Sequence, residues 1–197
     1  MNDQPDYYLA TNKAYEVLKH YGGGYPQIDV MYVIVVMFGD KITIHTYSEI
    51  AKRFGISTWD FARNYAESEM GFTVYNKNTE RYEILYNDLK SETTIRFTLA
   101  HELGHITLGH KEDNEAHNKE ANCFARNFLS PLPVRDEYKL KTVDEYRNCF
   151  NISDYAARTA LDKTETDRYY ITDGNYNDIS REAFIYITGY DPYEYFC

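Results

Sequence analysis

Cysteine is scarce in this sequence. Its three cysteines, Cys123, Cys149 and Cys197, form an odd and widely spaced set among 197 residues. Small secreted domains that depend on disulfides carry a denser and even set of cysteines, so this pattern excludes that class of protein. We therefore expect the chain to reside in a reducing cytoplasm.

Long hydrophobic runs are also missing. The longest apolar segment, residues 30–38, is about half as long as a membrane-spanning helix requires. The N-terminal residues MNDQPDYYLATNKAYEVL contain no basic start followed by an apolar core, so we expect no signal peptide. These features predict a soluble protein that does not enter a membrane.

Basic residues are outnumbered by acidic ones. The chain has 21 Lys and Arg against 31 Asp and Glu, which gives a formal net charge of −10. A negative surface opposes binding to the phosphates of nucleic acids, and no block of basic residues stands out. Direct DNA binding is therefore not expected, whereas 43% hydrophobic residues are enough to form a core.

The first half of the chain mixes helix and strand patterns. Residues 14–21 have helical spacing and end at a glycine run. Residues 30–38 are rich in β-branched side chains and by propensity favour a strand, although periodicity does not separate such a run from a buried helix. Alternation predicts strands in KITIHTY and in a hairpin formed by residues 72–75 and 81–86.

Helical patterns dominate elsewhere. Residues 48–54 and 58–68 look like two helices around a short turn, which weakly resembles a DNA-binding helix-turn-helix. Ser91 is the expected N-cap of a helix that runs to residue 109. Further helices are expected at residues 115–129, 134–150 and 153–163, and the tail from residue 164 is acidic and rich in tyrosine.

The segment RFTLAHELGHITLGH, residues 96–110, contains the pattern HExxH. On a helix, His101 and His105 lie on one face and can bind the same metal ion. Glu102 is displaced by one helical step, where its carboxylate can reach a water on that metal. Zinc lowers the pKa of such a water to about 7, and the carboxylate can then accept its proton. We therefore predict one Zn²⁺ ion, with His101 and His105 as ligands and Glu102 as general base.

A zinc site of this kind needs a third protein ligand. His110 is a candidate, but on a continuing helix it would point away from the face of His101 and His105. We therefore expect His110 to be a surface or packing residue. Among the acidic candidates, Glu120 precedes an apolar helix face, and spacing alone does not decide whether it is a surface acid or a ligand.

Asp113, Glu115 and His117 are the remaining candidates near the motif. They lie in the polar segment KEDNEAHNKE, which is typical of a solvated loop and a helix start. Acidic residues in a first helical turn also interact favourably with the helix dipole. A solvated loop and the start of a helix therefore account for most of these three residues without a metal ion.

Two segments, RFTLAHELGHITLGH and KEANCFARNFLSPLPV, resemble the ImmA/IrrE family of metallopeptidases. That family combines HExxH with a downstream Glu in an EAN-x-FA-type helix that ends at a proline-containing stop. The resemblance implies that His101, His105 and Glu120 bind zinc and that Glu102 is the general base. It also implies that residues 28–38 form a helix rather than a strand.

The fold implied is α+β, a zincin-like (gluzincin-like) minimal metallopeptidase with a small mixed sheet packed on the HExxH helix and a helical C-terminal part. We expect the metallopeptidase domain at residues 1–133 and a helical extension with a tyrosine-rich tail at residues 134–197. Because family members typically inactivate repressors inside the cell, the resemblance implies a zinc-dependent endopeptidase whose protein substrate is a helix-turn-helix transcriptional repressor.

Two other functions stay open at this point. One is a DNA-binding regulator with a structural metal site, although its candidate recognition helix carries Asp60 and Glu67 against a single basic residue, Arg63. The other is a protein-binding module without activity, which nothing in an intact HExxH favours. Arg96, Asn122 and several tyrosines are candidates for stabilising a transition-state oxyanion.

Overall fold

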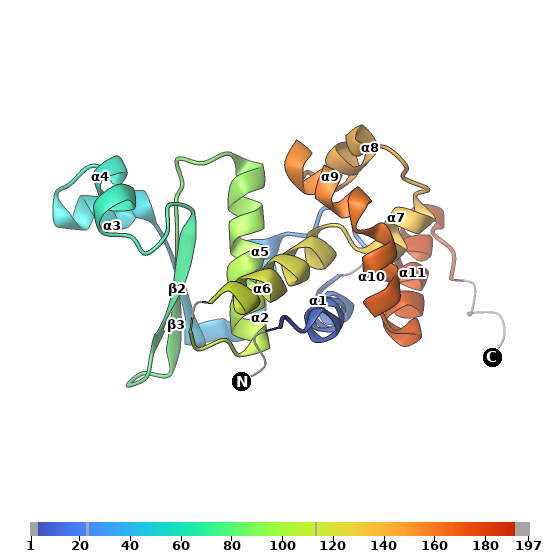
Figure 1. The fold of residues 1–197 in the computed structure, drawn as a ribbon, viewed down its shortest axis with the longest axis horizontal. Coiled ribbons are helices and arrows are strands. Elements are labelled where there is room, and N and C mark those ends of the chain that lie inside the picture. Colours follow the sequence, from blue (N-terminus) through green and yellow to red (C-terminus); the bar gives the residue numbers. More distant parts are fainter. Residues whose placement is uncertain (1–3, 23, 113, 192–197) are drawn as a thin grey trace. The chain divides into compact units, whose positions relative to one another are not determined.

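The computed structural model describes residues 4–22, 24–112 and 114–191 (Figure 1). The chain divides into two compact units, the first formed by Met1–Ile28 with Gly104–Cys197 and the second by Asp29–Leu103. Helix α5, Glu92–Leu108, belongs to both, because the boundary falls between Leu103 and Gly104. Within the described ranges, every helix is too short or too polar to cross a membrane.

The second unit contains a small mixed sheet. Its strands are β1 (Ile42–Thr46), β2 (Gly71–Asn76) and β3 (Arg81–Tyr86), in the order β1-β3-β2. Strand β1 runs parallel to β3, whereas β2 and β3 form the predicted antiparallel hairpin. Strand β2 therefore lies at an edge of the sheet.

Helix α2, Val30–Phe38, forms where propensity favoured a strand and the family resemblance implied a helix. Its N-cap is Asp29, whose carboxylate accepts the Tyr32 N–H at 3.0 Å. Burial follows helical spacing rather than alternation, with Val30, Val33 and Ile34 in the core. The cap and this three-residue stripe explain why the apolar run is helical.

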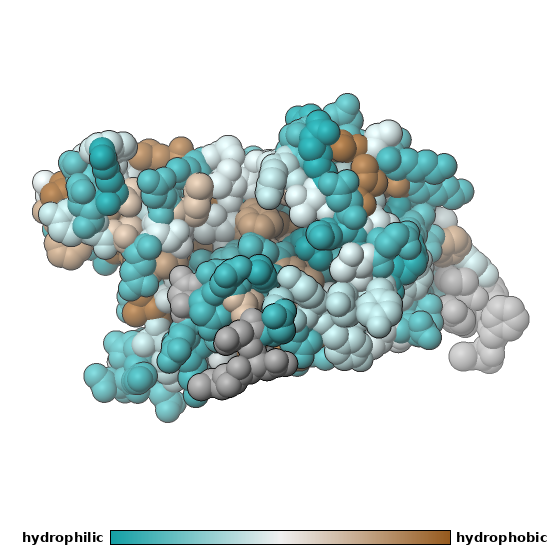
Figure 2. Space-filling view, in the orientation of Figure 1, coloured by the Kyte–Doolittle hydropathy of each residue, from teal (hydrophilic) through white to brown (hydrophobic). Residues whose placement is uncertain are grey.

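Helices α3 (Tyr47–Phe54) and α4 (Thr58–Asn64) form the predicted pair, although α4 ends before the predicted residue 68. The pair is packed on the sheet through a cluster of Tyr47, Ala51, Phe61 and Leu85. It also leaves large side chains exposed, with Phe54 72% and Trp59 58% accessible. Figure 2 shows apolar surface over these two helices (upper left).

Helix α5 packs against the hairpin. A Cβ atom at Gly71 of β2 would lie 2.5 Å from Thr98 Cγ2 of α5, so only glycine fits at that point of the strand. The Thr94 N–H donates to Ser91 Oγ at 3.3 Å, which agrees with the predicted N-cap. The sheet on the HExxH helix and the α+β class are thereby confirmed (Figure 1).

The first unit is built on the packing of α1 (Tyr7–Tyr21) against α6 (Glu115–Leu129). Tyr15 of α1 is fully buried, and its hydroxyl donates to Asn127 Oδ1 at 3.3 Å. The same hydroxyl accepts the Leu132 N–H at 2.9 Å. The α1–α6 contact thus extends to the segment that follows α6.

The C-terminal part is helical, as predicted. It consists of α7 (Leu132–Glu137), α8 (Val143–Phe150), α9 (Asp154–Asp162), α10 (Thr164–Tyr170) and α11 (Asp173–Thr188). The single helix predicted for residues 134–150 is wrong, because Lys139 adopts a positive φ of 55° and Thr142 caps a new helix. The tyrosine-rich tail is described up to residue 191, and the domain boundary at residue 133 stays a prediction.

A buried charge network joins α10 to α6 and α7. Asp167, which is 1% exposed, accepts hydrogen bonds from Arg126 at 2.6 Å and from Arg135 at 3.2 Å. Arg135 is also 1% exposed, and it further donates to the carbonyl of Ala160 at 3.0 Å. Asp167 therefore compensates a guanidinium that has almost no contact with water.

Replacing Asp167 by Ala should destabilise the protein severely. The substitution leaves the buried Arg135 charge uncompensated, and breaking such a pair costs about 3–5 kcal/mol. Urea denaturation of the two proteins measures this loss. The matched control is Asp154→Ala, which removes an exposed Asp–Arg pair and should leave the midpoint unchanged. Equal midpoints for Asp167→Ala and Asp154→Ala would contradict the role of the network.

Candidate active site

The HExxH pattern lies within the continuous helix α5. His101 and His105 are therefore one turn apart on one face of that helix, as predicted. The neighbouring Leu99 and Leu103 are buried at 3% and 0% exposure. Core packing on the leucine side of α5 thus sets the rotation of the helix and leaves the two imidazoles half-buried beside it.

Glu102 is held by the edge strand of the sheet. Its side chain is 6% exposed, and Thr73 Oγ1 of β2 donates to Glu102 Oε2 at 2.7 Å. Burial raises the pKa of the Tyr47 phenol, and the negative charge of Glu102 raises it further. The carboxylate is therefore oriented and partly shielded from water, which suits a general base. The pattern in the sequence did not reveal Thr73.

His110 is a packed residue, but the structure contradicts the expectation that it points away from the motif. That expectation assumed a continuing helix, but α5 ends at Leu108 and Gly109 has a φ of 72°. The chain turns at this glycine, and the His110 N–H donates to the His105 carbonyl at 3.0 Å. The His110 side chain is 6% exposed and lies beside the motif.

The His110 ring connects two residues that the sequence singled out. Its Nδ1 lies 3.0 Å from His105 Nδ1, and its Nε2 lies 2.7 Å from Glu120 Oε2. The ring also stacks on His117, with centroids 4.1 Å apart. Burial lowers the pKa of His110, and the hydrogen bond to Glu120 partly opposes that shift. Burial therefore favours a neutral imidazole at this position.

Glu120 is a buried residue of α6 and not a surface acid. It is 9% exposed, and its Oε1 accepts the backbone N–H of Asp6 at 2.6 Å while its Oε2 contacts His110. Asp6 is 114 positions away in the sequence, so no local pattern could have indicated this contact. The carboxylate therefore has a polar partner on each oxygen, and a carboxylate offers about four acceptor positions in total.

The other candidates near the motif have structural roles. Glu115 pairs with Lys119 at 2.6 Å on the exposed face of α6. The His117 N–H donates to the N-cap Asn114 Oδ1 at 2.8 Å. Asp113 lies outside the described residues. Of the three cysteines, Cys197 also lies outside them, and Cys123 and Cys149 carry free thiols.

The chemistry of these side chains suits zinc. Imidazole nitrogens and a carboxylate oxygen are ligands of catalytic zinc sites, which keep a further position open. Among the residues described, no group of three or more His, Cys, Asp or Glu side chains is arranged to hold a metal ion. The donor set of His101, His105 and Glu120 fits zinc by ligand type, and the two histidines also fit by their helical spacing.

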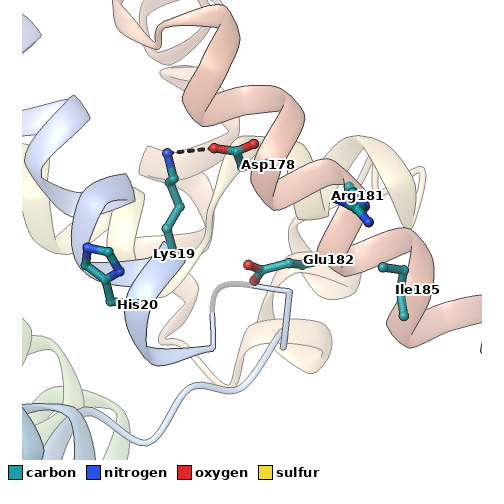
Figure 3. Close-up of a pocket in the computed structure, with 6 residues that line it drawn as sticks. All are labelled: Lys19, His20, Asp178, Arg181, Glu182 and Ile185. Carbon is teal, nitrogen blue, oxygen red and sulfur yellow. Dashed lines mark ion pairs between the residues drawn. The ribbon is translucent and has the colours of Figure 1, made fainter. Parts of the chain in front are cut away.

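A cavity of about 260 Å³ lies elsewhere in the first unit, between α1 and α11 (Figure 3). Its lining is mostly charged, and Lys19 and Asp178 form an ion pair of 2.6 Å across it. It contains none of the residues predicted to form the zinc site. The remaining lining residues are His20, Arg181, Glu182 and Ile185.

The α+β fold with HExxH on helix α5 is typical of a zincin-like metallopeptidase. Residues 62–158 match the family model Peptidase_M78, described as the IrrE N-terminal-like domain. The chain therefore carries a metallopeptidase domain of the ImmA/IrrE family, and the resemblance found in its motifs is confirmed. The matched range includes α5 and α6. No curated protein matches the chain.

Helices α5 and α6 approach each other closely at Gly104, so we expect that no side chain larger than that of glycine fits there. A Cβ atom there would lie 3.2 Å from both Ala121 Cα and Phe124 Cβ. We expect Gly104→Val to lower the free energy of unfolding by about 1–3 kcal/mol, as overpacking does. Urea denaturation measures this change.

The matched control is Gly174→Val, because a Cβ atom at Gly174 has nothing within 4 Å. It should show no loss of that size. A Gly104→Val protein as stable as this control would contradict the close contact between the two helices.

Proposed function

We propose that this protein is a zinc-dependent endopeptidase that hydrolyses a peptide bond in a protein substrate. The observation that carries the proposal is the buried carboxylate of Glu102, held by Thr73 at 2.7 Å on the helix that presents His101 and His105. A carboxylate of this kind next to two imidazoles one turn apart is the arrangement that metal-assisted peptide hydrolysis requires.

The residues that would hold the ion are His101, His105 and Glu120. A zinc ion bound there would act as a Lewis acid on the scissile carbonyl and increase the acidity of the attacking water. Glu102 accepts the proton of that water as it attacks the carbonyl carbon. The same carboxyl group then donates the proton to the leaving amine, so one residue serves as base and acid in turn.

The substrate class is part of the proposal. We infer that the substrate is a helix-turn-helix transcriptional repressor, because the motifs resemble a family whose members inactivate such proteins. We also infer that the reaction takes place in the cytoplasm, which agrees with the free thiols of Cys123 and Cys149. The α3–α4 pair packs Tyr47, Ala51 and Phe61 on the sheet, which supports a structural role for this helix pair and not a DNA-reading one.

Substituting Glu102 by Gln should abolish catalysis and keep the metal. Loss of a general base lowers a rate by about 10²–10⁴-fold. The test is to incubate metal-loaded wild-type and Glu102→Gln proteins with candidate helix-turn-helix repressors and to follow cleavage by mass spectrometry. Glu115→Gln, the same change at an exposed acid of α6, should cleave as the wild type does. Cleavage that survives Glu102→Gln would contradict this mechanism.

Substituting Glu120 by Ala should remove tight zinc binding, because the site loses its only carboxylate ligand. Metal analysis of the purified variant after dialysis against a weak chelator measures the retained zinc. Glu115→Ala is the control and should retain one zinc ion per chain. A Glu120→Ala protein that also retains one ion would assign the third ligand to a different residue.

A further inference from the structure

His110 lies between two residues that the proposed function makes zinc ligands. Its Nδ1 is 3.0 Å from His105 Nδ1, and its Nε2 is 2.7 Å from Glu120 Oε2. All three residues belong to the first unit, so these contacts lie within one compact body. Both ring nitrogens of His110 are therefore engaged by other side chains, and neither presents a lone pair to a metal ion.

The positions of the protons follow from the chemistry of the three groups. Because His105 Nδ1 contacts His110, a zinc ion held by His105, as the proposed function requires, would be bound through Nε2. A neutral imidazole that offers the Nε2 lone pair carries its proton on Nδ1, which can donate to His110 Nδ1. His110 then accepts at Nδ1 and carries its own proton on Nε2. An ionised Glu120 only accepts, so His110 Nε2–H donates to it.

We propose, on the basis of the proposed function, that His110 is a positioning residue of the zinc site. It accepts the Nδ1 proton of His105 and donates its Nε2 proton to Glu120. The first hydrogen bond fixes the tautomer of His105 that binds zinc through Nε2, and the second orients the carboxylate. Groups that orient metal ligands in this way typically change metal affinity by about 10–100-fold when removed.

The surroundings of His110 restrict it to this role. The positive φ of Gly109, 72°, ends the helix and turns the chain so that the next side chain reaches back to His105. The stacked ring of His117, with an interplanar angle of 9°, limits rotation of the His110 imidazole. Asp6 N–H donates to the second oxygen of Glu120, so the carboxylate is held from two sides.

The zinc affinity of full-length variants tests this role without any substrate. Competition with a chromogenic chelator gives the dissociation constant for zinc. We expect His110→Ala to bind zinc about 10–100-fold more weakly than the wild type. We expect His110→Gln to recover part of that loss, because a glutamine amide offers both an acceptor oxygen and an NH₂ donor group. His20→Ala, a histidine of the cavity between α1 and α11, is the control and should bind as the wild type does.

The outcomes separate this proposal from the proposed function. If the wild type binds zinc and His110→Ala binds it equally well, His110 has no positioning role, while the zinc peptidase proposal stands. A glutamine variant no better than the alanine variant would also overturn the role, because the hydrogen bonds would then not matter. A wild type that does not bind zinc would instead overturn the proposed function.

A spectroscopic measurement on the wild type covers the case in which His110→Ala fails to fold. In the zinc-loaded protein labelled with ¹⁵N-histidine, NMR identifies which ring nitrogen of each histidine carries a proton. We expect His105 to be protonated on Nδ1 and His110 to be neutral and protonated on Nε2. A metal-bound nitrogen in His110, or a proton on its Nδ1, would overturn the assignment.

Discussion

The helical register of α5 determines which side chains act together in this protein. His101 and His105 share a face because they are one turn apart, and Glu102 follows the first histidine by one position. Buried Leu99 and Leu103 fix the rotation of the helix on its core side. Thr73 then holds Glu102 from the edge strand at 2.7 Å. A shift in that register would move the proposed base, Glu102, away from the proposed ligands, His101 and His105.

The end of the same helix matters as much as its register. Gly109 stops α5 in a left-handed conformation, and His110 consequently turns back towards His105 and Glu120. Burying a carboxylate is costly unless donors surround it. Glu120 receives one donor from His110 and one from the backbone of Asp6, so the start of α1 and the end of α5 both help to hold it.

Much of the fold could be predicted from the sequence, because alternation, caps and helix stops are local signals. The hairpin, the Ser91 cap and the helix that carries HExxH are examples. Residues 30–38 are a helix against their propensity, since the Asp29 cap and the burial of one face outweigh the β-branched side chains. The helix at these residues was predicted from the family resemblance and not from the local sequence pattern.

The parts of the site that could not be predicted depend on contacts between distant residues or on a single backbone angle. The prediction that His110 points away from the motif was wrong because a helix was extended through Gly109, although glycine after the last helical turn is a known stop signal. Thr73 and Asp6 lie 29 and 114 residues from their partners. Separations of that size leave no periodic trace in a single sequence.

The proposed function requires one zinc ion bound by two imidazoles and one carboxylate. Extended X-ray absorption at the zinc edge of the metal-loaded wild type measures this ligand set directly. We expect two histidine nitrogens at about 2.0–2.1 Å with one or more oxygen ligands at about 2.0–2.2 Å. A spectrum that requires a third histidine or a sulfur ligand would contradict it.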